Sequence, residues 1–300
     1  MTDGKLSVLH HIRAYSKNSA GIEFLASILK GKTGTLDLLY VKEILEDIED
    51  DSRRDLAEEQ KPEKEKLSAE KVISNTRTTM SELLPEFNLS SISTSGDPAK
   101  EVLTLGTQKD YDLLSLEAYG KGGFKKSVLG AHGNKIVKAS KIPTLVHKGE
   151  LDSCERLLIH IPNDRDRCTD LVTYLTDLFE GSKPAITFLV ILSKESEKFE
   201  GYISGEEEYL NESLENYARE EYSYLDIAQE IISERGMEAD VRYRVGEITE
   251  EILTEAREGR YDLMAFSPEK QNILNSLWSG NKSLEVIREI EVSVLKFPST

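Results

Sequence analysis

The sequence predicts an α/β protein built from two tandem doubly wound domains, each with a five-stranded parallel sheet. Three observations predict this fold. The chain has 300 residues, which is long for one core and ordinary for two domains. Short apolar runs alternate with stretches of helical periodicity, as in parallel βαβ units. The chain also repeats itself once, with a period too long for a solenoid.

The repeat is visible when the two halves are aligned without a gap at a shift of 150 residues. "SGDPAKEVLTLGTQKDYDLL" (95–114) then lies over "VGEITEEILTEAREGRYDLM" (245–264), and Gly130 lies over Gly280. The boundary falls near "KGELDSCE" (148–155). We therefore expect one domain over residues 1–149, the first half, and a second over 150–300, the second half.

Each expected element follows from local pattern. Continuous apolar runs such as "LDLLYV" (36–41) suit strands covered on both faces, and in the first half they predict strands near 6–12, 35–41, 88–94, 112–117 and 143–147. Apolar residues at helical spacing predict a helix between the first two strands of each half, with faces made by Ile22, Leu25, Ile28 and Leu29 and by Val172, Leu175, Leu178 and Phe179. A helix near 63–84 follows a polar segment (50–62), and another begins at Asp97 and Pro98, residue types that suit a helix start.

Composition restricts the class of protein and of partner. The net charge is −17, and it is uneven: residues 1–150 have 22 basic and 23 acidic residues, whereas 151–300 have 16 and 32. An acidic second half should repel nucleic acid and acidic membranes, so we expect neither as a partner. No apolar run approaches the roughly 20 residues that span a bilayer. Cys154 and Cys168 form no metal-ligand pattern, and we expect a reduced, cytoplasmic protein.

A glycine-rich stretch, "YGKGGFKKSVLGAHGN" (119–134), lies between the expected fourth strand and the last helix of the first half. Backbone N–H groups at a helix start beside a glycine turn bind anions, and in doubly wound sheets ligands bind at the carboxyl ends of the strands. No acidic residue occurs between Ala118 and Lys148, while seven lysines do: Lys121, Lys125, Lys126, Lys135, Lys138, Lys141 and Lys148. The stretch is either a nucleotide site, a remnant of one, or a basic loop.

With these motifs the chain resembles the universal stress proteins, in their tandem form with two domains on one chain. The resemblance covers nearly the whole length and rests on "SKNSAGIEFLA" (16–26), "GDPAKEVL" (96–103), the strand "YDLLSLE", the glycine loop and "KIPTLVHK" (141–148). We therefore expect the strand order 3-2-1-4-5 in each half. Nucleotide-binding members carry Gly-x-x-Gly, nine residues, then Gly-Ser/Thr around the phosphates. They also have an aspartate near the adenosine and an adenine contact at the end of the second strand.

Neither half keeps the full set. In the first half the loop reads Glu117-x-x-Gly120, nine residues, Gly130-Ala131, and the aspartate position is Ala14. The second half has the aspartate as Asp164, but its loop reads Ser267-x-x-Lys270, nine residues, Gly280-Asn281. The resemblance places the remaining nucleotide contacts at Val41, Gly120, Lys121, Gly122, Gly123, Gly130, Ala131, His132 and Asp164. We expect no tightly bound cofactor, with ATP or AMP at low affinity.

These residues favour a non-enzymatic stress-response protein that acts through protein contacts and keeps a vestigial adenine-nucleotide site. The alternative is an ATP- or AMP-binding regulatory protein that uses the loop of the first domain. A third possibility is a slow nucleotide hydrolase. The missing hydroxyl at Ala131 and the absence of a clear general base count against this activity. The protein partner cannot be named from the sequence, and a homodimer is one option.

Four further expectations follow from the sequence. His10 and His160 should be core histidines rather than a metal or catalytic pair, and no spacing of Cys, His and acid predicts a metal site. Trp278 either contacts a partner or fills the emptied pocket of the second half. The family dimerises through its last strand, so 142–147 and 292–297 should pair within this chain. The uneven charge of the halves could also steer one molecule onto another.

Overall fold

The computed structural model describes residues 5–13, 20–43, 69–120, 127–192, 224–268 and 280–298. In the first half, strands and helices alternate in the order β1 (Lys5–Ile12), α1 (Ala20–Ile28), β2 (Thr33–Glu43), α3 (Ala69–Leu83), β3 (Phe87–Gly96), α4 (Pro98–Gln108), β4 (Leu113–Glu117), α5 (Ala131–Ala139) and β7 (Thr144–His147). A short hairpin of β5 (Tyr119–Gly120) and β6 (Ser127–Val128) precedes α5. The sequence did not predict this hairpin, because neither two-residue strand has a pattern of its own.

The second half repeats this order with β8 (Arg156–His160), α6 (Arg165–Phe179), β9 (Ala185–Leu192), α9 (Leu225–Glu234), β10 (Ala239–Val245), α10 (Ile248–Glu258), β11 (Leu263–Phe266), α11 (Gly280–Glu289) and β12 (Ser293–Lys296). The expected helix near 63–84 is described from Ala69 to Leu83, and α4 begins as expected. There Asp97 is the N-cap residue, accepting hydrogen bonds from the backbone N–H groups of Ala99 and Lys100, and Pro98 opens the helix.

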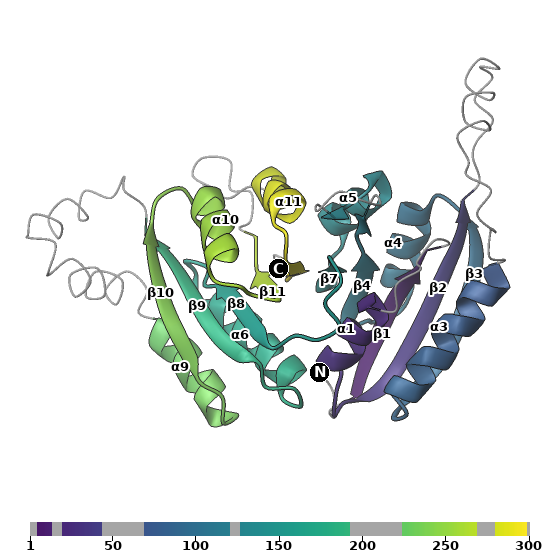
Figure 1. The fold of residues 1–300 in the computed structure, drawn as a ribbon, viewed down its shortest axis with the longest axis horizontal. Coiled ribbons are helices and arrows are strands. Elements are labelled where there is room, and N and C mark those ends of the chain that lie inside the picture. The colour runs from purple at the N-terminus through teal and green to yellow at the C-terminus, as the bar shows by residue number, and fades with distance from the viewer. Residues whose placement is uncertain are drawn as a thin grey trace, which may run out of the picture.

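All ten strands of the two repeats form one sheet, ordered β10-β9-β8-β11-β12-β7-β4-β1-β2-β3 (Figure 1). Read from its outer edge to the centre, each half has the order 3-2-1-4-5, as predicted, and its strands are parallel. The central pair, β7 with β12, is antiparallel, and Leu145 lies opposite Leu295. The predicted pairing of the last strands is therefore confirmed.

Helices cover both faces of this sheet. Helices α1, α3, α6 and α9 pack on one face over a buried cluster that includes Phe24, Leu25, Phe179 and Phe188. Helices α4, α5, α10 and α11 lie together on the other face, over a second cluster that includes Ile136, Ile252 and Ile287 (Figure 1). Both clusters draw residues from both halves, so the two repeats share their core.

A second contact joins the halves away from the central strands, just after α1 and α6. Gly31 and Gly181 hold equivalent places in the repeat, and a Cβ atom on Gly181 would lie 1.9 Å from the Lys30 carbonyl oxygen. Glycine is required there because the two backbones approach too closely for any side chain. Beside them Lys32 Nζ lies 2.9 Å from Glu180 Oε2.

Two lysines bind the halves reciprocally at the ends of their last helices. The ammonium of Lys148, which is 1% exposed, donates to the carbonyls of Ile287 and Ile290 at the C-terminal end of α11. Lys296 of the second half donates to the carbonyls of Val137 and Ser140 at the end of α5, at 2.8 and 3.4 Å. A lysine so placed satisfies carbonyls that have no partner within the helix and opposes the negative end of its dipole. Lys148 was expected beside the anion loop, and the structure corrects this by burying it between the halves.

Candidate functional site

The candidate site lies at the carboxyl edge of the sheet in the first half. Strand β2 ends here at Glu43, β3 ends before Asp97, and β4 ends at Glu117. Helix α5 begins at the same edge, with Gly130 as its N-cap residue. The strand order reverses between β1 and β4, which is where ligands bind in sheets of this type.

The predicted contact residues divide into three groups. Gly130, Ala131 and His132 form the start of α5, and Val41 is buried two residues before the end of β2. Gly120 pairs with Ser127 in the β5–β6 hairpin. Lys121, Gly122 and Gly123 lie outside the described residues, as do Ala14 and Trp278.

The first turn of α5 is faced by carboxylates of its own chain. His132 Nε2 lies 2.9 Å from Glu43 Oε1, and His132 Nδ1 lies 3.5 Å from Asp97 Oδ1. Lys135 Nζ approaches the other Asp97 oxygen at 3.6 Å. Two acids thus stand where a phosphate would approach the positive end of the helix. The sequence did not reveal this, because 89 residues separate Glu43 from His132.

Asp97 is held as a carboxylate. Hydrogen bonds from the backbone N–H of Lys100 and Ala99 lower the pKa of Asp97, and the charge of Lys135 lowers it further. The carboxylate both caps α4 and faces α5. The acidic residue noted at the start of this helix in the sequence therefore has a second role that only the fold reveals.

The N-terminus of α5 keeps some capacity for an anion. Gly130 at the N-cap has no side chain to accept a hydrogen bond from the first-turn N–H groups, and an added Cβ on Gly130 would meet no atom within 4 Å. Ala131 at the first helical position is exposed and offers no hydroxyl group. Backbone N–H groups at such an end have no partner within the helix.

Glu117, the acid that replaces the first glycine of the motif, points toward α1. A Cβ on Gly21 would lie 2.4 Å from Glu117 Oε1, so the carboxylate packs directly on the backbone at the start of α1. The backbone oxygen of Glu117 accepts a hydrogen bond from Arg13 at 3.5 Å. The side chain therefore fills space beside the ends of β1 and β4, where the strand order reverses.

In the second half, polar side chains of the chain itself occupy the equivalent edge. Asp164 is the N-cap residue of α6, and its Oδ1 accepts a hydrogen bond from the Arg167 backbone N–H at 2.9 Å. The Arg167 side chain donates to the Ser267 carbonyl oxygen at 2.7 Å, at the position equivalent to Glu117. The structure thus gives Asp164, the expected adenosine contact, a capping role.

The same half also repeats the contact at the start of its last helix. Glu247 and Lys282 are equivalent to Asp97 and His132, and Lys282 Nζ lies 2.5 Å from Glu247 Oε1. Burial alone would raise the pKa of Glu247, but hydrogen bonds from Lys282 and from the backbone outweigh burial and lower it. In both halves, then, the acid that caps one helix lies beside a basic side chain at the start of the next.

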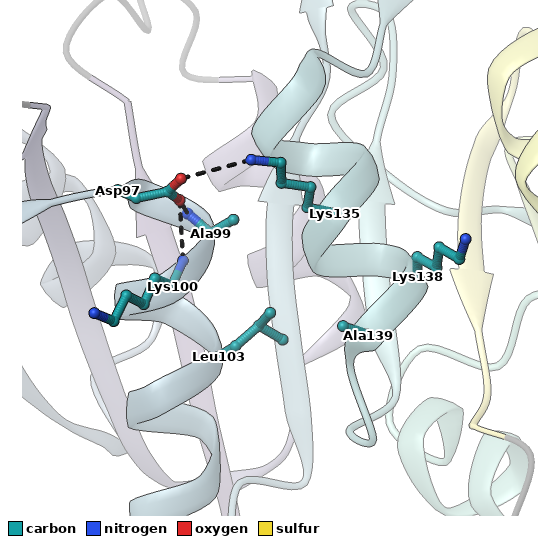
Figure 2. A pocket seen from close by; sticks show the side chains of 7 residues that line it. All are labelled: Asp97, Ala99, Lys100, Leu103, Lys135, Lys138 and Ala139. Atoms are coloured by element: carbon teal, nitrogen blue, oxygen red, sulfur yellow. Dashed lines mark hydrogen bonds and ion pairs between the residues drawn. The ribbon is translucent and has the colours of Figure 1, made fainter. Parts of the chain in front are cut away.

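A groove of about 610 Å³ lies beside this edge, between α4 and α5 (Figure 2). Ala99, Leu103 and Ala139 provide its apolar surface, and Asp97 closes one end. Three lysines line it as well: Lys100, Lys135 and Lys138. Of the predicted contact residues that the structure describes, none lines this groove.

Metal and membrane roles receive no support from the described residues. No group of three or more His, Cys, Asp or Glu side chains among them could hold a metal ion. None of the helices in the described ranges is both long and apolar enough to cross a bilayer. Both cysteines are free and buried.

Comparison with known proteins identifies the first half by sequence. The family model described as "Universal stress protein family" matches residues 16–148. No curated protein sequence matches the chain.

Comparison with solved structures covers nearly the whole chain. A universal stress protein from Archaeoglobus fulgidus DSM 4304 is similar with a TM-score of 0.65 at 17% identity, covering 96% of this chain and 97% of that one. A functionally unknown protein from Pseudomonas aeruginosa PAO1 has a TM-score of 0.64 at 14% identity, covering 98% and 92%. At these identities the likeness shows the fold. Residues 16–148 therefore match the universal stress protein family by sequence, and nearly the whole chain has the fold of these solved structures.

Proposed function

We propose that this protein is a non-enzymatic, tandem universal stress protein that acts through protein contacts, and that its adenine-nucleotide site is vestigial. One observation carries the proposal: Glu43 and Asp97 face the first turn of α5, the helix start to which a phosphate would bind. Like charge at this position opposes a polyanion such as ATP.

The neighbouring positions support the same conclusion. The carboxylate of Glu117 lies against Gly21 at the reversal of strand order. In the second half, Arg167 bonds to Ser267, and Asp164 is engaged as a helix cap. A ligand entering either edge would have to displace interactions that the chain makes with itself.

The first experiment is to denature protein purified from cells and to analyse the supernatant for adenine nucleotides. We expect none in stoichiometric amount. Calorimetric titration with ATP should then show weak binding or none. Stoichiometric release, or tight binding by the wild type, would overturn the vestigial site and establish the nucleotide-binding alternative.

A repair experiment tests the residues. Ala131→Ser with Ala14→Asp and Glu117→Gly restores the motif, and Glu43→Gln with Asp97→Asn removes the facing charges while Asn still caps α4. We expect the variant with all five substitutions to bind ATP at least about tenfold more tightly than the wild type, since about 1.4 kcal/mol gives that factor. The matched control combines the three motif substitutions with Glu86→Gln and Asp110→Asn in place of Glu43→Gln and Asp97→Asn. It removes the same number of acids, but these two are exposed and flank the amino ends of β3 and β4, at the opposite edge of the sheet.

A regulatory role for bound ATP or AMP is the second candidate. The uncapped start of α5 and the open space over Gly130 favour it, because backbone N–H groups there can still meet an anion. If the wild type binds ATP and the affinity falls on Gly130→Val, this candidate replaces the first.

A further inference from the structure

Four helices make one continuous layer on a single face of the sheet, in the order α4, α5, α11 and α10 (Figure 1). Helix α5 contacts α11 at the middle, where Arg288 Nε donates to Asn134 Oδ1 at 3.1 Å. The groove between α4 and α5 opens in the first-half part of this layer (Figure 2). The layer therefore presents equivalent helices of both repeats side by side.

The charge of this layer is reversed between its two ends. Helices α4 and α5 together have three lysines and one acid, whereas α10 and α11 have three basic residues and six acids. The reversal occurs at equivalent exposed positions: Lys100 corresponds to Glu250, and Lys135 corresponds to Glu285. One end of the layer is thus basic and the other acidic, with the central pair between them.

We propose that this four-helix layer is a dimerisation surface that binds a second copy of the chain face to face. A two-fold axis lying in the plane of the layer, between α5 and α11, exchanges its ends, so the basic end of each copy meets the acidic end of the other. Such an interface is self-complementary and closed, and it contains the same contact twice. The proposal is independent of nucleotide binding.

The groove supplies the apolar part of this contact. Ala99, Leu103 and Ala139 are surrounded by lysines there, so an acidic helix can cover the groove with its carboxylates against the lysines of the rim. The α10 and α11 end of a second copy exposes Glu250 and Glu285 for this contact, while the apolar side chains of both helices pack in that copy's own core. The reversal of charge at equivalent positions favours a second copy over another acidic protein. Each lysine at the basic end has an equivalent glutamate at the acidic end, so two copies of the same surface complement each other.

The test is a charge-swap experiment by sedimentation at 0.15 M salt over a range of concentrations. We expect the wild type to dimerise. Lys100→Glu/Lys135→Glu and Glu250→Lys/Glu285→Lys should each raise the dimer dissociation constant by about tenfold or more, because the two-fold axis places each reversal at both contacts. An equimolar mixture of the two variants should form a heterodimer of roughly wild-type affinity, since acidic ends then face basic ends again.

Salt and a control variant separate specific pairing from net charge. The wild-type dimer should weaken between 0.15 and 1 M salt, where the Debye length falls from about 8 to about 3 Å. Lys5→Glu/Lys30→Glu changes the net charge by the same amount as Lys100→Glu/Lys135→Glu, but at exposed positions outside the layer. This control variant should leave the dimer unchanged. Thermal unfolding of each variant verifies that it is folded.

Three results would overturn the proposal. One is a wild type that stays monomeric at all concentrations. Another is a dimer that neither charge-reversed variant weakens. The third is a pair of weakened variants whose mixture fails to associate, which would assign the basic end to a different acidic partner.

Discussion

At the scale of single residues, two histidines lie at equivalent positions in the innermost strands of the two repeats. His10 is 2% exposed and His160 5% exposed, as expected for core histidines. His10 Nδ1 lies 3.1 Å from Ser115 Oγ. Burial lowers the pKa of His10 to about 3, helped by the charges of His11 and His147. Burial likewise lowers the pKa of His160 to about 3. Both rings are therefore neutral in the folded protein at ordinary pH.

This predicts a loss of stability in mild acid. The unfolded state binds protons at these rings below pH 6.5, while the folded state does not until about pH 3, so stability is lost as pH falls through this window. At pH 5 each ring should cost about 2 kcal/mol relative to pH 7. Urea unfolding at the two pH values measures the difference.

The variant that tests this is His10→Gln, which removes one such ring. Its loss of stability between pH 7 and pH 5 should be smaller than that of the wild type by about 2 kcal/mol. An unchanged pH dependence in His10→Gln would show that this ring titrates normally in the folded state.

At the scale of elements, a lysine from the other repeat caps the C-terminal end of the last helix of each repeat. Lys148 serves the C-terminal carbonyls of α11, and Lys296 serves those of α5. The carbonyls involved are equivalent, since Val137 corresponds to Ile287 and Ser140 to Ile290. Burial lowers the pKa of Lys296, so the hydrogen bonds must offset the loss of hydration.

We expect Lys148→Met and Lys296→Met each to lower the free energy of unfolding by about 1–3 kcal/mol, because hydrogen bonds to a charged group are lost and buried carbonyls are left without a partner. Chemical denaturation measures the change. The control is Lys138→Met, which removes an exposed lysine of α5, the helix whose end Lys296 caps. It should change the free energy of unfolding by no more than about 0.5 kcal/mol. A Met variant as stable as the control would mean that water or the neighbouring backbone satisfies these helix ends equally well.

At the scale of the whole molecule, the sequence was sufficient for what depends on local pattern and on the repeat. Apolar runs located the strands, Asp97 with Pro98 located the start of α4, and the resemblance predicted the pairing of β7 with β12. The features that could not be predicted depend on contacts between distant residues. His132 and Glu43 are 89 positions apart in the sequence, and Lys148 and Ile287 are 139 positions apart. No local sequence pattern predicts contacts at such separations.

The central strand pair makes the chain resemble a dimer of repeats fused into one molecule. Position 295 corresponds to 145 in the repeat, and Leu145 lies directly opposite Leu295. Both side chains are fully buried. A fragment of residues 1–149 would expose β7 as a sheet edge, and an exposed apolar edge pairs with another strand.

We therefore predict that residues 1–149 form a homodimer in which β7 pairs with β7 of the second copy around Leu145. The fragment contains no cysteine, so Leu145→Cys would place two thiols opposite each other across an antiparallel pair, within disulfide reach. Under mild oxidation this variant should give a covalent dimer on a non-reducing gel. Leu113→Cys in β4, equally buried, should not. If the fragment sediments as a monomer, or if both variants cross-link alike, the first half does not replace its missing partner through β7. The antiparallel pairing would then depend on the linkage of the two repeats in one chain.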